Sequence, residues 1–172
     1  MNILHAVALG GLVAMGCNTS VVPIDTVTNA PFDSLLLGQW QQIDPDSGEV
    51  VLTILEFDAP VYFIEADDTS GLPPVRSEQS RVRARAFITT LSGYTFMNVD
   101  ELSGRPRAYA LYQFGRAGDT LTIRELTKEA HKFESSAELR SYIVANVATP
   151  SLYEVNDVRF RRVPKQSVPA PR

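Results

Sequence analysis

The sequence predicts an all-β domain with one helix, in which an antiparallel meander closes into a barrel of about eight strands and the helix precedes the last strand. Three observations indicate this fold. Residues 81–126 read as four strands joined by short connectors rich in Gly, Ser, Pro and Asp. Polar and apolar side chains alternate along residues 81–88, as in a strand with one buried face. Such a meander must close on itself or be covered.

The expected strands are rich in β-branched and aromatic residues and are bounded by turn residues. In chain order they are Gly38–Ile43, Val50–Phe57, Val61–Glu65, Arg81–Leu91, Tyr94–Val99, Arg107–Phe114, Thr120–Leu126 and Glu154–Val163. Residues 67–80 form the longest irregular stretch, which we expect to be either disordered or a functional lid. Both faces of residues 107–114 are partly apolar, so this strand is expected to be covered on both sides.

Three arginines share one face of the strand at residues 81–91. Arg81, Arg83 and Arg85 alternate there with Val and Ala residues. We expect the arginines to point outwards and to pair with carboxylates of neighbouring strands, because the apolar face has to be buried. If they pointed inwards, they would form an anion site instead.

One amphipathic helix is expected before the last strand. Ser135 and Glu138 form a capping box that starts it, and Pro150 ends it. Its apolar stripe, at helical spacing, consists of Leu139, Tyr142, Ile143 and Val147. We expect this stripe to pack on the barrel. A helix lying on a membrane surface would need more basic residues than the single Arg140.

The composition is that of a globular protein of one domain, with 172 residues and a formal net charge of -4. This mild acidity argues against nucleic acid as a partner, because binding phosphates requires a basic face. The one cysteine, Cys17, excludes an intrachain disulfide.

The N-terminus carries the strongest signal for localisation. Ile3–Val13 is an apolar run too short to span a bilayer, and it fits the core of a secretory signal. The residues that follow it, Ala14-Met15-Gly16-Cys17, resemble the lipobox of bacterial lipoproteins. That resemblance implies cleavage before Cys17, acylation of Cys17 and anchoring in the lipid bilayer. Asn18, by resemblance to the sorting rule of enteric bacteria, implies the periplasmic face of the outer membrane rather than the inner membrane.

These signals divide the chain into four parts. Residues 1–16 are expected to be the signal peptide, and residues 17–30 a lipidated, flexible tether with a reach of roughly 20 Å. Residues 31–163 are the barrel domain, and residues 164–172 are a disordered, proline-rich tail. The alternative for the N-terminus is a core element with Cys17 as a buried thiol, which the polar run after Cys17 disfavours.

The strand pattern, together with Gly38-Gln39-Trp40 at the start and Arg162 near the end, resembles the lipocalin superfamily. The resemblance implies that Trp40 plugs the closed end of the barrel and that Arg162 lies over its ring. The chain also looks like the uncharacterised lipocalin-like lipoproteins of Gram-negative bacteria. The segments that carry this likeness are Phe96–Val99, Ser135–Leu139 and Arg159–Arg162. Lipocalins place their helix after the last barrel strand, so a flattened or partly open barrel is the alternative here.

Two functions follow from such a barrel. It could bind a small hydrophobic ligand, in a pocket lined by residues chosen for their aromatic or aliphatic side chains: Tyr94, Phe96, Tyr109, Leu111, Tyr112 and Phe114. Alternatively, these side chains fill the interior, and the barrel is a structural or interaction protein that meets an envelope partner. A cavity above roughly 300 Å³ would favour the ligand. A solid core with an exposed apolar patch would favour the partner.

Enzyme motifs are scarce, and we expect no catalytic residue, no cofactor and no metal. His131 lies in a polar connector and is expected to be solvated. Asp67 and Asp68 are adjacent, so we do not interpret them as a catalytic pair. The run at residues 44–48 is interpreted as a turn, because it lacks the glutamate that ends a calcium loop.

Overall fold

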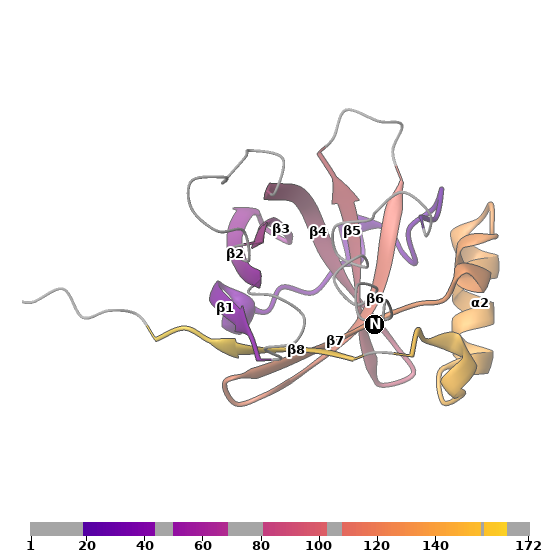
Figure 1. Ribbon diagram of the computed structural model, residues 1–172. Helices are drawn as coiled ribbons and strands as arrows, with labels where there is room; N and C mark the ends of the chain where they lie inside the picture. Colours follow the sequence, from indigo (N-terminus) through magenta and orange to yellow (C-terminus); the bar gives the residue numbers. More distant parts are fainter. Residues whose placement is uncertain (1–18, 44–49, 69–80, 103–107, 156, 165–172) are drawn as a thin grey trace, which may run out of the picture.

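A computed structural model of the protein shows an eight-stranded antiparallel barrel that closes between its first and last strands. The structure describes residues 19–43, 50–68, 81–102, 108–155 and 157–164. Its strands follow chain order around the barrel (Figure 1). They are β1 (Gly38–Gln42), β2 (Val50–Asp58), β3 (Val61–Asp68), β4 (Arg81–Leu91), β5 (Tyr94–Glu101), β6 (Tyr109–Ala117), β7 (Thr120–Glu125) and β8 (Val158–Arg162). The predicted fold class is confirmed, and the barrel is closed rather than flattened.

The strand boundaries differ from the predicted ones by a few residues. β3 and β5 extend further than expected, because their acidic ends still pair with neighbouring strands. The last strand is shorter, since only Val158–Arg162 pair with β7 and β1. The predicted strand at 154–163 therefore includes a connector as well as β8.

The barrel interior is filled by the inward-facing residues of all eight strands, which form one apolar cluster. Fully buried members include Trp40, Ile54, Tyr62 and Phe160. On β4 the Val and Ala face points inwards, as expected from its alternation. The apolar interior therefore follows from the alternation of side chains along strands whose sheet closes into a barrel.

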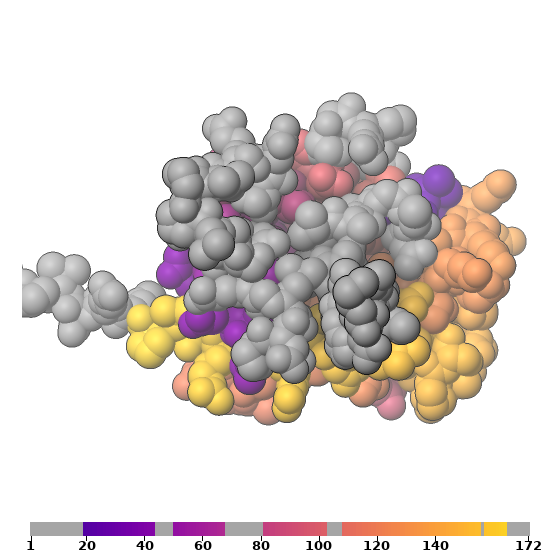
Figure 2. Space-filling model, in the orientation of Figure 1, coloured from indigo at the N-terminus to yellow at the C-terminus, as the bar shows by residue number. Residues whose placement is uncertain are grey.

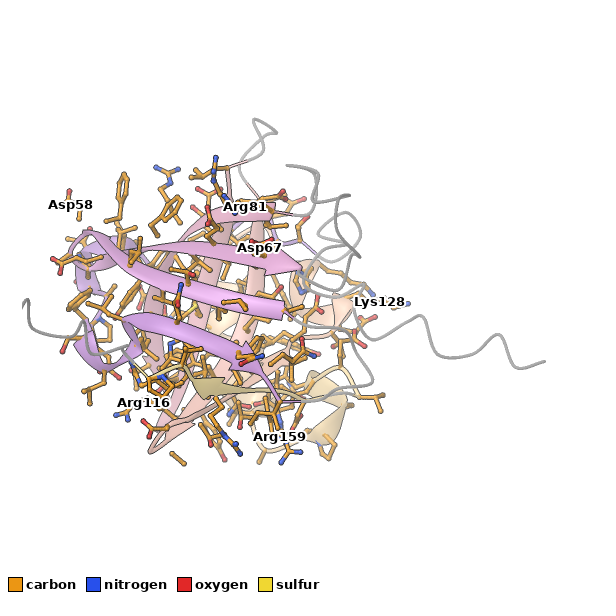
Figure 3. All side chains as sticks on the ribbon, turned by 60° about the vertical axis from the view of Figure 1, so that its left-hand side comes forward. Asp58, Asp67, Arg81, Arg116, Lys128 and Arg159 are labelled. Carbon is orange, nitrogen blue, oxygen red and sulfur yellow. The ribbon has the colours of Figure 1, made fainter. Side chains whose placement is uncertain are left out.

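The arginines of β4 point outwards and pair with carboxylates of adjacent strands, as predicted. Arg81 lies 3.2 Å from Asp67, and Arg83 lies 3.0 Å from Glu65. Figure 3 shows Arg81 and Asp67 on neighbouring strands. These are exposed pairs, which contribute little to stability. No anion site is formed inside the barrel by this row.

A second core lies on the outside of β4, β5 and β6. Its barrel side includes Phe87, Phe96 and Leu111, and the predicted two-sided burial of β6 is confirmed. It is covered by the helix α2 (Ser136–Asn146), which stands beside the barrel in Figure 1. It is also covered by residues 19–25, which we call the N-terminal arm, through the fully buried Ile24.

The helix α2 begins at the predicted capping box and precedes β8. The Ser135 hydroxyl accepts a hydrogen bond from the Glu138 amide at 3.3 Å and donates one to the Glu138 carboxylate at 2.9 Å. Leu139 and Ile143 are fully buried in the outer core. The apolar stripe thus faces the barrel, as expected. Short 3₁₀ helices occur at Val27–Asn29 (η1), Ser34–Leu36 (η2), Lys128–His131 (η5) and Pro150–Leu152 (η6).

The N-terminal arm differs from the flexible tether expected for residues 17–30. Ser20 exchanges two backbone hydrogen bonds with Tyr109, at 2.8 and 2.7 Å. The Ile24 amide donates to the Asn98 side chain at 2.7 Å, and Ser136 donates to the Pro23 carbonyl at 2.6 Å. From residue 19 onwards the expectation of a flexible tether is therefore wrong, because this segment is part of the folded domain.

Candidate functional site

Among the described residues, the barrel interior contains a cavity with a volume of about 40 Å³. Its lining comes from β2 through β7 and is apolar, with Ile54, Ile64, Met97, Tyr112 and Phe114 among its side chains. A cavity for a small-molecule ligand is typically 300 Å³ or larger, by order of magnitude. The space in the described barrel is therefore comparable to a few water molecules.

Tyr112 also lines this cavity, whose wall is apolar, and its hydroxyl is an unusual buried polar group. Tyr112 is only 6% exposed, and its hydroxyl oxygen finds no hydrogen-bond partner within the described ranges. Burial raises the pKa of Tyr112, and the negative charges of Glu125 and Glu101 act in the same direction. The phenol therefore stays neutral and can donate a hydrogen bond. A buried donor without an acceptor costs about 1–3 kcal/mol.

The six residues predicted to line a ligand pocket do not lie together. Tyr112 and Phe114 line the interior cavity. Phe96, Tyr109 and Leu111 belong to the outer core, and Tyr94 is 39% exposed at the surface.

The separation follows from alternation along each strand. On β6, Tyr109 and Leu111 share one face while Tyr112 and Phe114 share the other, so one pocket could not use both pairs. On β5 the inward residues are Met97 and Val99, which the choice of aromatic side chains missed. Met97 and Val99 pair with inward-facing residues of β4, and this pairing could have identified them as inward-facing from the sequence.

The closed end of the barrel is built from Gly38, Trp40 and Arg162. Trp40 is fully buried, and its indole donates to the Leu36 carbonyl at 2.8 Å. The Arg162 guanidinium lies 4.1 Å from the centre of the Trp40 ring and donates to the Leu37 carbonyl at 2.8 Å. It also donates to the Leu35 carbonyl.

Gly38 is required by this closed end for two reasons. Its φ is 129°, which side chains rarely adopt, and an added Cβ would lie 3.0 Å from the Arg162 guanidinium. The glycine therefore leaves room for the guanidinium that covers Trp40. These contacts make the end of the barrel a solid floor rather than an entrance.

An open surface groove of about 500 Å³ lies between Tyr94, the end of α2 and the connector to β8. Its cation, Arg124, makes two hydrogen bonds to Asp157 at 2.7 and 2.8 Å. The same guanidinium lies 5.6 Å from the centre of the Tyr153 ring. Because Arg124 is already paired, the groove presents no free cation to an anionic ligand.

The candidate ionisable residues have ordinary structural partners. His131 ends η5 and is half-buried, with its Nε2 atom 3.2 Å from the Leu126 carbonyl oxygen, so the expectation of a solvated side chain is wrong. Burial lowers the pKa of His131, while the Leu126 carbonyl, the Glu154 charge and the Thr19 backbone raise it. Asp67 pairs with Arg81. Across the described ranges, no cluster of His, Cys, Asp or Glu could hold a metal ion.

Several predicted features lie outside the described residues. They are Cys17 with the signal segment, the turn at 44–48, most of the connector at 67–80, and the tail from residue 165. None of the helices in the described part of the chain has the length and apolar character needed to cross a bilayer. Comparison with known family models, with characterised proteins and with solved structures finds no match for this chain.

Proposed function

We propose that this chain is a non-enzymatic lipoprotein of the bacterial cell envelope, with a filled, lipocalin-like barrel that acts through contact with an envelope partner. The observation that carries the filled barrel is the cavity volume of about 40 Å³. This volume is several-fold below the roughly 300 Å³ expected of a small-molecule site. The floor formed by Trp40 and Arg162 supports the same interpretation, because it closes one end.

The lipid anchor is supported by the N-terminal sequence. An apolar run ends at Ala14-Met15-Gly16-Cys17, where a lipoprotein signal is cleaved and its cysteine acylated. Asn18 favours the periplasmic face of the outer membrane. The Cys17→Ala variant is expected to leave the membrane fraction, as measured by fractionation and by the intact mass of the extracted protein. Retention of wild-type acyl mass on another residue would contradict this part of the proposal.

The contact role is supported by apolar side chains exposed at the closed end. Leu35 is 56% exposed, and on the outer face of β2 Leu55 and Phe57 are 49% and 60% exposed. Leu55 lies opposite Phe63 in the β2–β3 ladder. We define Leu35, Leu55 and Phe57 as the closed-end apolar set. Leu55 and Phe57 are two residues apart on one face of β2, and exposed apolar groups that lie side by side are typical of surfaces that meet another protein.

The test of the filled barrel is native mass spectrometry of the lipoprotein extracted from its own membranes in mild detergent. We expect the mass of the acylated chain without a bound small molecule. A ligand that co-purifies at stoichiometric amounts and is lost on unfolding would contradict the filled barrel.

A small hydrophobic ligand in the barrel is the second candidate function, and the Tyr112 hydroxyl is the observation that favours it. A slender apolar molecule with a neutral acceptor, such as a carbonyl or an alcohol, would satisfy this donor. Glu101 and Glu125 disfavour an anionic group beside it. If a ligand co-purifies, Tyr112→Phe should reduce its occupancy, whereas Phe87→Leu in the outer core should leave it unchanged.

A further inference from the structure

Residues 20–25 of the N-terminal arm are held against the barrel by several contacts. Its backbone pairs with Tyr109 through Ser20, and the Ile24 amide is bound by the Asn98 side chain. Asn98 is fixed in turn, because it donates to the Thr89 hydroxyl at 3.0 Å. Asp25 forms an ion pair with Arg140 of α2. The chain is therefore held in place from Ser20 onwards.

This attachment leaves a short link to the lipidated residue. Three Cα–Cα steps separate Ser20 from Cys17, and a chain spans at most about 3.6 Å per residue. The Cys17 Cα atom therefore lies within about 11 Å of the Ser20 Cα atom. A flexible tether over residues 17–30 would reach roughly 20 Å and would allow the domain to rotate.

The attachment point lies at one particular end of the barrel. Ser20 pairs with Tyr109, the first residue of β6, and Thr19 lies beside His131 of η5. β6 begins at the end where β5 finishes, so Leu102 lies there too. The closed end, with the β2–β3 turn, is at the other end of the strands. Figure 3 shows Lys128 of η5 at one end and Asp58 of that turn at the other.

The surface around the attachment point suits a lipid interface. Val21 is 64% exposed and Leu102 is 46% exposed, and Lys128 is exposed on η5 at the same end of the barrel. Apolar side chains can enter the headgroup region, while a lysine can remain at the level of the phosphates. We define Val21, Leu102 and Lys128 as the anchor flank. Figure 2 shows the same face as Figure 1, with α2 and the β8 connector at its right-hand side.

We propose that the anchor flank rests on the bilayer and that the closed end of the barrel points away from it, because the folded arm leaves only a short link to the lipidated Cys17. This inference rests on the proposed lipidation of Cys17. β2 spans nine residues, or about 30 Å, so the closed-end apolar set is held well away from the lipid surface. The fold would thus present Leu55 and Phe57 to a partner in the periplasm.

The test uses the acylated protein in phosphatidylcholine vesicles in which a fraction of the lipid carries a nitroxide on its headgroup. Leu102→Trp and Phe57→Trp place a reporter on exposed positions at the two ends, and the native Trp40 stays as a common background. We expect loss of Leu102→Trp emission in nitroxide vesicles and no loss for Phe57→Trp. Equal loss at both positions, or greater loss at Phe57→Trp, would overturn the proposed orientation.

A linker variant provides the matched control. Twelve Gly and Ser residues inserted between Asn18 and Thr19 add a reach of roughly 20 Å without touching the folded arm. The difference in emission loss between the two reporters should then disappear. If the difference persisted with the linker, the short link would not be what orients the barrel.

Failure of lipidation can be told apart from failure of the orientation. Intact mass shows whether the membrane-extracted protein is acylated. If it is not, the proposed anchor fails, and a maleimide phospholipid is coupled to the chain's one cysteine, Cys17, before the same measurement. Quenching confined to Leu102→Trp would then still support the orientation, and equal quenching would overturn it.

Discussion

The two cores of this molecule are built differently, although they share strands β4, β5 and β6. The interior core follows the period-two pattern, is closed by the Trp40 floor, and holds the hydroxyl of Tyr112 without a partner in the described part of the chain. The outer core is also apolar, but Asn98 is fully buried within it and binds both Thr89 and the N-terminal arm. Both cores bury apolar side chains of the barrel strands, but the outer core also determines where the N-terminus is held.

The difference shows what a buried polar residue contributes. Apolar packing favours burial but is poor at selecting one partner, whereas an amide side chain is satisfied only by correctly placed donors and acceptors. Asn98 therefore specifies the position of the arm, and apolar residues such as Ile24 supply the burial.

The largest effect is expected from the floor of the interior core. Trp40→Ala should lower the free energy of unfolding by about 3–5 kcal/mol, because it removes a fully buried aromatic ring. Urea unfolding followed by circular dichroism measures this change. Phe57→Ala, at an exposed aromatic residue, is the control and should be nearly neutral. Similar values for the two variants would mean that Trp40 does not close the barrel.

A smaller effect is expected from the polar centre of the outer core. Asn98→Ala should lower the free energy of unfolding by about 1–3 kcal/mol, because it leaves the Ile24 amide and the Thr89 hydroxyl without their partner. Thr89→Val, which removes one of these hydrogen bonds and keeps the shape, should cost less. If Thr89→Val lowered the free energy of unfolding more than Asn98→Ala, Asn98 would not be the polar residue that specifies the position of the arm.

Two tyrosines that point into the barrel are expected to respond with opposite signs. Tyr62→Phe should cost about 1 kcal/mol, because the Tyr62 hydroxyl accepts a hydrogen bond from the Asp33 amide at 2.6 Å. Tyr112→Phe should raise the free energy of unfolding by up to about 1 kcal/mol, since it removes a buried hydroxyl without a partner in the described ranges. Chemical unfolding of both variants measures the sign. Destabilisation by Tyr112→Phe would show that its hydroxyl is satisfied.

The smallest effect is expected in the pH dependence of stability, through His131 at the boundary of the outer core. The pKa of His131 is lowered from 6.5 by burial, so the unfolded chain binds the proton more readily than the folded one. The stabilising contribution is present above about pH 6.5 and is lost as the pH falls through the lowered pKa. The free energy of unfolding of the wild type should therefore fall more steeply between about pH 7 and pH 5 than that of His131→Gln. Parallel curves would show that the His131 pKa is unchanged on folding.

The fold was predictable because alternation and turns act locally. The arginine row of β4, the capping box at Ser135 and the two-sided burial of β6 were each readable from neighbouring residues. The residues that line the interior cavity were not predicted correctly, because the prediction grouped aromatic residues from both faces of one strand. Tyr109 and Tyr112 differ in parity, and that alone separates the outer core from the cavity.

The N-terminal arm could not be predicted for a different reason. Its sequence mixes polar and aliphatic residues with one proline and has no period, and its contacts are with residues far along the chain. Ile24 is bound by a residue 74 positions away, and Pro23 by one 113 positions away. Nothing local marks Ile24 as buried, so the segment resembles a linker until the barrel and α2 are assembled.

The most direct test of the folded arm is hydrogen exchange at the Ile24 amide, measured by NMR on the folded protein. This amide is buried and donates to Asn98, so it should exchange as slowly as the amides of β4 and β5 beneath it. Exchange at the rate of an unstructured peptide would show that the arm is a free tether. The short link to the lipid, and the orientation derived from it, would then be contradicted.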